Sequence, residues 1–424
     1  MPLGKPEAGR KALAKKKETA EMFDVLIAGG GYVGLSLAVA LKQGDSSLKC
    51  AVVDPKPMDQ LHRDPRASAI AAAASRMLAQ LGIWQKIEAD AQPINEMIVT
   101  DSKLRDAVRP VFLTFDGEAT EGEPFAHMVP NGVMMPALYK AAKSLDVSFF
   151  APGTAETFRT FSDHAELELE GGKVLKGRLL VAADGVRSKL RELAGIRTVN
   201  WDYGQSGIVT TVKHERPHNG RAEEHFLPAG PFAILPLPGN RSSLVWTEKT
   251  LDADRLVRSD EFTFELELER RFGHHLGKLE VEGKPRAYPL GLKLARDFVK
   301  PRFALIGDAA HGIHPIAGQG LNLGFKDVAA LAEVLVDARR LGQDPGAFDV
   351  LERYQRWRRF DTFQMGVVTD VLNRLFSNDN DILRAARDFG LGLVDRMPGL
   401  KSHFIKEAAG FAGPVPKLLS GEPI

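Results

Sequence analysis

The residues with the clearest chemical potential are glycines that follow an apolar run near the start of the chain. The segment Gly29–Gly34 has the sequence GGGYVG and comes directly after the apolar residues Val25–Ala28. The run predicts a strand and the residues after the glycines predict a helix, the context in which a G-x-G-x-x-G spacing binds a dinucleotide. Gly29 permits a sharp turn, Gly31 lets the backbone approach a phosphate, and Gly34 lets helix and strand pack closely. The helix N-terminus offers free N–H groups to the pyrophosphate.

A single carboxylate follows at the end of the next apolar run. Asp54 ends the segment LKCAVVD, twenty residues after Gly34, which is the separation at which an acid meets the adenosine ribose hydroxyls. The competing interpretation of Val25–Leu41 is a membrane span, because its 17 residues are uncharged. The segment is short for a span, and each glycine would cost a continuous helix about 1 kcal/mol relative to alanine. We therefore predict a nucleotide-binding strand, turn and helix.

A second strand end resembles the first. The apolar run that ends at Ala182 and Ala183 is followed by Asp184 and Gly185, and a helix is predicted to begin at Val186. An Asp-Gly pair is often only a turn. Its apolar approach and helical exit nevertheless match the first motif, so we expect the chain to return here to the same ligand.

A third strand end lies at Phe303–Ile306 and leads into Gly307 and Asp308. A glycine-punctuated loop, His311–Gly320, and a helix of about twenty residues follow. The helix N-terminus directs N–H groups and partial positive charge into the loop, which suits a reduced flavin ring and is worth about 0.3–2 kcal/mol. Asp308 is placed to accept hydrogen bonds from ribityl hydroxyls.

The same segment carries a competing chemistry. Asp308, His311 and His314 recur at every third position, and two histidines with one carboxylate form the ligand set of non-haem iron sites. That spacing needs a regular helix to bring the three side chains together. Gly312 and Pro315 argue against such a helix, so we predict no metal site.

Two further polar residues precede predicted helices. Arg66 stands before an Ala-rich helix that ends near Leu81, and from there it could reach a pyrophosphate or an adenosine. Asn131 comes just before a helix predicted over Val133–Leu145, where an N-cap is its simplest role.

Composition limits the class of protein that carries these motifs. The 56 basic and 55 acidic side chains of this 424-residue chain nearly cancel, so no global field would recruit nucleic acid. Cys50 is the only cysteine, which excludes an internal disulfide framework and fits a reducing compartment. Its place in an apolar run indicates a buried thiol. No secretory signal is visible near the N-terminus.

We expect an α/β fold in which a Rossmann-like nucleotide-binding domain is interleaved with a β-sheet substrate domain and followed by a helical C-terminal region. No Ser- or Pro-rich linker separates the units, which favours interleaving. The predicted boundaries are 1–22 for a disordered basic tail; 23–95 with 130–195 and 297–350 for the nucleotide-binding domain; 96–129 with 196–296 for the sheet domain; and 351–424 for the helical region.

The sheet domain and the helical region each allow two interpretations. Alternating apolar positions in 201–296 indicate a sheet with one covered face that could close over a cofactor. There His225 and Trp246 could supply polar tips, although core or solvent positions are the simpler expectation. The C-terminal helices carry apolar stripes and basic residues such as Arg353–Arg359. This pattern fits a bundle interior or, alternatively, a surface that lies on a membrane.

Taken together, the motifs resemble a known superfamily. GGGYVG with Asp54, AADGVRS at Ala182–Ser188 and GDAAHGIHPIAGQGLNLG at Gly307–Gly324 resemble the single-component FAD-dependent aromatic hydroxylases, over about residues 23–410. Within that superfamily, the segments HPIAGQGLN, RASAI, FAILPLP, LNRLFSND and DRMPGLK most resemble the hydroxylases of ubiquinone biosynthesis.

The resemblance implies FAD as the cofactor and a polyprenylated phenol as the substrate. Reduced FAD would react with O₂ to give a flavin hydroperoxide that delivers an electrophilic OH to the ring. NAD(P)H or an external donor would supply the electrons. His314 is the nearest candidate for accepting the phenol proton, and Pro315 joins it as a catalytic candidate. The residues implied to bind FAD are Pro315, Gly320, Leu321 and Asn322 around the ring, Asp308, Asp184 and Arg66 along the chain, and Gly29, Gly31, Gly34, Asp54, Asn131, Gly307 and Gly318 elsewhere in the site.

Two positions depart from the family pattern. Asp54 stands where the family more often has Glu, a change that should preserve ribose binding. Gly132 follows Asn131 where a bulkier, often basic residue is expected, which weakens the case for Asn131 as a cofactor ligand.

The implied substrate also sets an expectation for location. Moving a polyprenyl tail costs about 0.8 kcal/mol for each CH₂ exposed to water. We therefore expect a cytoplasmic protein that either attaches peripherally to the inner membrane or receives substrate within a quinone-biosynthesis complex. The alternatives are a soluble hydroxylase of a small phenol or benzoate, and a flavin-binding structural member of a quinone-synthesis assembly.

Overall fold

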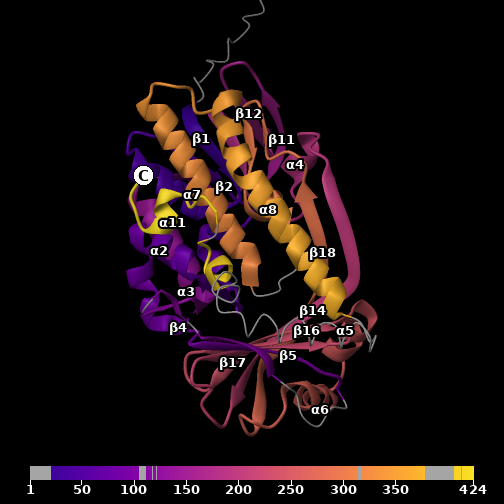
Figure 1. Ribbon diagram of the computed structural model, residues 1–424. Coiled ribbons are helices and arrows are strands. Elements are labelled where there is room, and N and C mark those ends of the chain that lie inside the picture. Colours follow the sequence, from indigo (N-terminus) through magenta and orange to yellow (C-terminus); the bar gives the residue numbers. More distant parts are fainter. Residues whose placement is uncertain are drawn as a thin grey trace, which may run out of the picture.

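The computed structural model describes residues 21–104, 111–116, 118–120, 122–313, 318–377, 405–411 and 413–424. Figure 1 shows a sheet that contains β1, β2 and β12 at one end of the molecule and a second sheet, with β17 and β5, at the other. Helix α8 runs from the first part toward the second, where it contacts β16 and β18. The predicted α/β class is confirmed.

The first sheet is mainly parallel and carries the nucleotide-binding motifs. Its strands in spatial order are β10 (Ser148–Phe150), β2 (Cys50–Val53), β1 (Met22–Ala28), β13 (Val174–Ala182), β12 (Ala165–Leu169) and β11 (Ala155–Thr160), and β20 (Phe303–Leu305) pairs with β13 and with β19 (Val299–Lys300).

The second sheet is mainly antiparallel, and its sixth and seventh strands pair segments that are distant in the sequence. In spatial order its strands are β21 (His311–Gly312), β18 (Leu279–Ala295), β14 (Thr198–His214), β17 (Arg241–Lys249), β16 (Gly230–Leu237), β15 (Arg221–Leu227), β5 (Glu96–Asp101) and β6 (Val111–Asp116). A small sheet of β3 (Ala67–Ala71), β9 (Ala126–Pro130) and β4 (Gln92–Pro93) contacts β16 of the second sheet and α7. Separately, β7 (Glu118–Thr120) pairs with β8 (Glu123–Pro124).

Helices cover the first sheet and the outer face of the second. They are α1 (Tyr32–Gly44), α2 (Ala72–Gln80), α3 (Asn131–Ser144), α4 (Lys189–Leu193), α5 (Thr250–Val257), α6 (Glu261–Phe272), α7 (Gln319–Arg340), α8 (Phe348–Phe376) and α11 (Lys417–Ser420). Short 3₁₀ turns lie at Met58–Arg63, Trp84–Lys86, Glu88–Asp90 and Gly307–Ala309. Within the described residues, no helix combines the length and apolar character needed to cross a bilayer.

Parallel pairing aligns the carboxyl ends of four strands. Ala28 of β1 pairs with Val53 of β2 and with Ala182 of β13, and Ala182 pairs with Leu305 of β20. The last three residues of each of these strands are apolar and form the centre of the main core. Because the strands run in the same direction, the residues that follow each of them emerge at one edge of the sheet.

Several local predictions can be compared with these bounds. The strand, turn and helix over Val25–Leu41 are confirmed, and Cys50 is buried, which raises the pKa of its thiol to about 12. The helix predicted from Val186 is wrong, because α4 begins only at Lys189. Ser188 caps that helix by accepting a hydrogen bond from the Arg191 amide at 3.0 Å.

The strand-rich region 201–296 is confirmed, but it also contains α5 and α6, which the sequence did not predict. Both helices pack in one cluster with Ile208 and Trp246 on one face of the second sheet, and α6 does so through Phe264, Leu268 and Phe272. That packing leaves the opposite face of the sheet toward the first. The domain boundaries themselves remain predictions.

Candidate functional site

The glycine turn after β1 is shaped by close backbone packing. A Cβ on Gly29 would lie 2.2 Å from the Ala183 carbonyl oxygen, and one on Gly34 would lie 2.0 Å from the Gly29 carbonyl oxygen. Gly29 also has φ of 118°, a region that side chains disfavour. A Cβ on Gly31 would meet nothing within 4 Å. The turn is therefore closed on the protein side at Gly29 and Gly34 and open at Gly31.

Asp54 holds this turn in place. Its Oδ2 accepts a hydrogen bond from the Gly30 amide at 2.8 Å, and its Oδ1 accepts one from the Lys56 amide at 2.8 Å. Each carboxylate oxygen keeps a second lone pair, and the side chain is partly accessible. Asp54 thus fixes the turn and still has capacity to accept a hydroxyl from a ligand.

Asp184 carries a buried oxygen that has no donor. Its Oδ2 accepts a hydrogen bond from the Leu190 amide at 3.3 Å, whereas Oδ1 is buried and has no partner among the described residues. Desolvation raises the pKa of this carboxyl above its ordinary value. A buried acceptor without a donor is costly, and a hydroxyl of a bound ligand would satisfy it.

Asp308 follows β20 on the 3₁₀ turn Gly307–Ala309. Its side chain is accessible to solvent, yet the surrounding protein desolvates the carboxyl and raises its pKa above the ordinary value. A carboxylate with both properties lies in a recess rather than on a convex surface. Gly307 has φ of 59°, which lets the chain turn at this point.

The N-terminus of α7 closes the other side of the site. Gly318 is its N-cap with φ of 65°, no side chain caps the helix, and its first turn contains no acid. A Cβ on Gly320 would meet nothing within 4 Å. Leu321 packs at the edge of the main core. The helix N-terminus therefore presents its partial positive charge and, at Gly320, open space to a ligand.

The Asn322 side chain is hydrogen-bonded to the backbone of β3. Its Oδ1 accepts a hydrogen bond from the Ala71 amide at 2.9 Å, and its Nδ2 donates to the carbonyl oxygens of Ala69 at 2.9 Å and Gly318 at 3.1 Å. These bonds make Asn322 a positioning residue that joins α7 to β3. Its predicted contact with a flavin ring remains a prediction.

Arg66 and Asn131 meet at Asp64, an acid that the sequence did not single out. Arg66 donates two hydrogen bonds of 2.8 Å to the Asp64 carboxylate, and Asn131 Nδ2 donates a third at 2.9 Å. Burial alone would raise the pKa of Asp64, but these hydrogen bonds hold it at about 2. The N-cap role predicted for Asn131 is wrong, because Asn131 lies inside α3, Pro130 is the N-cap, and the Asn131 side chain bonds Ser68 and Asp64.

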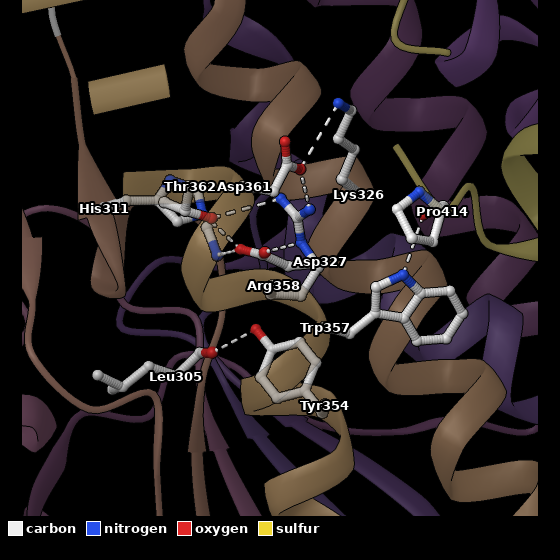
Figure 2. Close-up of polar contacts among 11 residues, drawn as sticks. Leu305, His311, Lys326, Asp327, Tyr354, Trp357, Arg358, Asp361, Thr362 and Pro414 are labelled. Carbon is white, nitrogen blue, oxygen red and sulfur yellow. Dashed lines mark hydrogen bonds and ion pairs between the residues drawn. The ribbon is translucent and has the colours of Figure 1, made fainter. Parts of the chain in front are cut away.

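A buried ionic network, which was not predicted from the sequence, holds the end of β20 in place (Figure 2). Asp327 of α7 is fully buried; its Oδ2 lies 2.5 Å from His311 Nε2 and accepts the Gly307 amide at 2.9 Å. Arg358 of α8 donates to Asp327 Oδ1 at 2.9 Å. Tyr354, one turn earlier, donates to the Leu305 carbonyl at 2.8 Å.

Electrostatics explain why this network persists without solvent. Burial by itself raises the pKa of Asp327, but the charges of His311 and Arg358 hold it below the ordinary value. An available signal was Asp327 in the segment GFKDVAALAEVLV, because it interrupts an otherwise apolar helix face. Because β20 and α7 both carry predicted site residues, this network positions them relative to each other.

Other predicted residues have different outcomes. His314 and Pro315 lie outside the described residues, as do most of the basic tail and the segments around 378–404. The described residues contain no cluster of three metal-ligating side chains. His225 and Trp246 are both buried core residues, bonded to Thr100 at 2.8 Å and to Glu248 at 2.9 Å respectively.

These features fit a dinucleotide whose pyrophosphate and extended polyol cross the sheet edge. The turn is open where phosphate would lie, at Gly31, and α1 has no capping side chain and no acid in its first turn. Asp184 has an unsatisfied acceptor, and the α7 N-terminus is open at Gly320. The turn at Gly31 is complementary to a phosphate, the Asp184 carboxylate to a hydroxyl, and the α7 N-terminus to an electron-rich ring.

Comparisons with known proteins agree with this geometry. The FAD binding domain family matches residues 22–360. The chain is 45% identical over 409 residues to the ubiquinone hydroxylase UbiL of Rhodospirillum rubrum, covering 95% of this chain and 94% of that protein. It is 35% identical over 396 residues to the 3-demethoxyubiquinol 3-hydroxylase of Escherichia coli, covering 92% and 100%. The solved structure of p-nitrophenol 4-monooxygenase PnpA from Pseudomonas putida aligns with a TM-score of 0.76 at 19% identity, covering 93% and 100%.

Proposed function

Because this chain belongs to the FAD binding domain family, and matches hydroxylases of ubiquinone biosynthesis over nearly its whole length, we propose that it is an FAD-dependent monooxygenase that hydroxylates the ring of a polyprenylated phenol in that pathway. The observation that carries the proposal is the meeting of Asp54, Asp184 and Asp308 at one sheet edge with two uncapped helix N-termini. Bound FAD, once reduced, would activate O₂ so that one of its oxygen atoms can be transferred to the ring.

The protein's own residues bind and orient the cofactor. The α1 N-terminus and Gly31 would hold the pyrophosphate, and Asp54 the adenosine ribose. Asp184 and Asp308 would accept hydrogen bonds from the polyol, and Arg66 would lie near the pyrophosphate. The N-terminus of α7, with Gly318, Gly320 and Leu321, would face the ring, and Pro315 is proposed to contact it.

Analysis of quinones in a strain that lacks the gene tests this function. We expect accumulation of a prenylated, under-hydroxylated quinone precursor, because the missing hydroxyl blocks later steps. A normal quinone content would overturn the proposal and would favour the small-phenol hydroxylase.

A structural role within a quinone-synthesis assembly predicts a different result. A variant that is present and folded but lacks FAD would then restore quinone synthesis. The proposed enzyme predicts that this variant fails.

We also propose that the outer face of α8 contacts an anionic membrane surface. Phe360, Phe363, Val367 and Val371 form a stripe at spacings of three and four residues and are 74%, 56%, 42% and 52% exposed. The exposed Arg359 borders this stripe on one side, and the exposed Arg374, which pairs with Asp370 at 2.9 Å, lies at its other end. Apolar side chains flanked by arginines suit lipid headgroups, and contact would let the enzyme collect a substrate with a polyprenyl tail.

Cosedimentation of the full-length holoprotein with phosphatidylglycerol vesicles tests this contact. Replacing Phe360 and Phe363 together by Ser should weaken binding at least about tenfold, because two apolar anchors are lost, while FAD absorbance is unchanged. The matched control is Phe262→Ser on α6, where the phenylalanine is 76% exposed and lies away from the stripe. Equal binding by the double variant and the control would contradict the proposal.

A further inference from the structure

An acid interrupts an apolar row that crosses the second sheet. Directly paired residues on adjacent strands point to the same face, and Glu224 of β15 pairs with Ala233 of β16 and with Val99 of β5. From β18 to β6 the row is Arg286, Val209, Val245, Ala233, Glu224, Val99 and Leu113. Glu224 is its only acid and its only buried ionisable member, because Arg286 is exposed at the far end of the row.

Neighbours on the same strand show which way this row faces. Side chains two residues apart share a face, so Ala222 and Phe226 lie on the side of Glu224. Ala222 packs in one cluster with Met128 of β9, and Phe226 packs with Leu375 at the end of α8. The other face of β15 packs against α5 and α6. Glu224 therefore points toward the small sheet and α8, not toward the outer helices.

This face leads to the proposed flavin site. The small sheet includes β3, whose Ala69 and Ala71 are bonded by Asn322 at the start of α7. Tyr288 of β18 lies 5.5 Å from the Arg66 guanidinium, which joins the second sheet to the site at another point. The interval between the two sheets is thus bounded on one side by the Glu224 row and on the other by elements that carry predicted cofactor ligands.

The described residues do not fill this interval completely. Val209, Val245 and Leu235 lie on central strands of an eight-stranded sheet, on the covered face, and are nevertheless partly accessible. Central residues beneath another layer stay accessible only when space remains between the layers. That space is lined by aliphatic side chains around one carboxyl group.

Glu224 has no partner within the described part of the chain. It is 3% exposed, it makes no hydrogen bond or ion pair with a described residue, and burial raises its pKa to about 7. The adjacent Glu223 is 6% exposed on the opposite face. Although burial raises the pKa of Glu223, His225 at 3.1 Å and His275 at 2.9 Å hold it at about 2. A buried acid without a donor is costly, so Glu224 is explained best by a ligand that donates to it.

We propose that the Glu224 carboxylate accepts the ring hydroxyl of the phenolic substrate and takes its proton during hydroxylation. This inference rests on the proposed function. The phenol O–H bond breaks, an O–H bond forms on Glu224, and the electron pair stays on the ring oxygen, so nothing is oxidised in this step. The added electron density activates the ring carbon toward the electrophilic oxygen. After oxygen transfer breaks the O–O bond, the proton of that carbon passes through water to the oxygen left on the donor, and Glu224 returns its proton to the ring oxygen.

The same arrangement sets specificity. An apolar row accommodates a prenyl tail beside the phenol, whereas a benzoate would bring a second negative charge near a buried carboxylate, which is disfavoured. The site therefore selects neutral phenols with apolar substituents.

Glu224→Gln tests the proposal, because glutamine keeps the volume but accepts no proton. With 2-prenylphenol as the probe and chemically reduced holoprotein exposed to O₂, the yield of hydroxylated product should fall about 100-fold, while FAD content and melting temperature stay near those of the wild type. A ring-fluorinated 2-prenylphenol, which ionises more readily, should narrow the difference between wild type and variant. Glu224→Asp, which retains the acid, should recover part of the yield and serves if the glutamine variant does not fold.

Glu223→Gln is the matched control, since it is adjacent and buried but on the other face. It should change stability without changing product yield. An equal deficit of Glu224→Gln with both phenols would overturn the proton transfer and leave only a structural role.

A binding measurement separates this inference from the proposed function. The ultraviolet spectrum of the fluorinated phenol should shift toward that of its phenolate on binding to the wild-type holoprotein, and not on binding to Glu224→Gln. If no hydroxylated product forms with wild type but this shift is seen, the proposed function fails and the role of Glu224 stands. If hydroxylation occurs and no shift distinguishes the two proteins, only the role of Glu224 fails.

Discussion

Replacing Arg358 with Met is expected to lower the free energy of unfolding by about 3–5 kcal/mol. Arg358 is 3% exposed and donates to Asp327, which is fully buried. Methionine would fill much of the volume but would leave the Asp327 carboxylate with only His311 and the Gly307 amide. When one member of a buried ion pair is lost, the other charge remains unpaired in an environment that solvates it poorly. Denaturant unfolding followed by fluorescence measures the change.

A neighbouring arginine provides the control for this prediction. Arg359→Met alters an exposed side chain on the same helix and should change stability by no more than about 0.5 kcal/mol. We also expect Arg358→Met to bind FAD more weakly, because the network joins β20 to α7. Equal stability of the two variants would show that Asp327 does not depend on Arg358.

Predictions of local structure from the sequence have a different physical basis from predictions of contacts between distant residues. The strand ends at Ala28, Val53 and Ala182 were predictable because apolar runs followed by glycine or aspartate encode local structure. Their meeting at one edge follows from parallel pairing, which the crossover helices impose. The helix start at Lys189 was missed because a single cap, Ser188, decides it.

Contacts between distant residues were beyond such reasoning. Arg66 and Asn131 were named as candidates, but Asp64, which bonds both, was not. The pairing of Asp327 with Arg358 joins two helices through their buried faces, and the sequence spacing of 31 residues carries no periodic signal for it. Glu224 acquires meaning only from a row of five apolar partners on other strands. These features depend on register and packing, which local patterns do not determine.

Two glycines of the first motif should respond to alanine in opposite ways. Gly34→Ala is expected to prevent stable folding, with a loss above about 4 kcal/mol, because its Cβ would lie 2.0 Å from the Gly29 carbonyl oxygen. Both atoms belong to rigid backbone between β1 and α1, so neither can move aside. Soluble yield and the circular dichroism melt measure this effect.

Gly31→Ala should instead fold normally and fail to bind FAD. Gly31 has φ of −77° and ψ of −172°, which alanine adopts without strain, and the new methyl group would meet no protein atom within 4 Å. It would occupy the space proposed for the pyrophosphate, so FAD affinity should fall at least about 100-fold, or close to 3 kcal/mol. Isothermal titration of the apoprotein measures it. Wild-type affinity in this variant would place the pyrophosphate elsewhere, whereas a folded Gly34→Ala protein would show that β1 and α1 can separate. The pair thus distinguishes a glycine required by the fold from one required by the ligand.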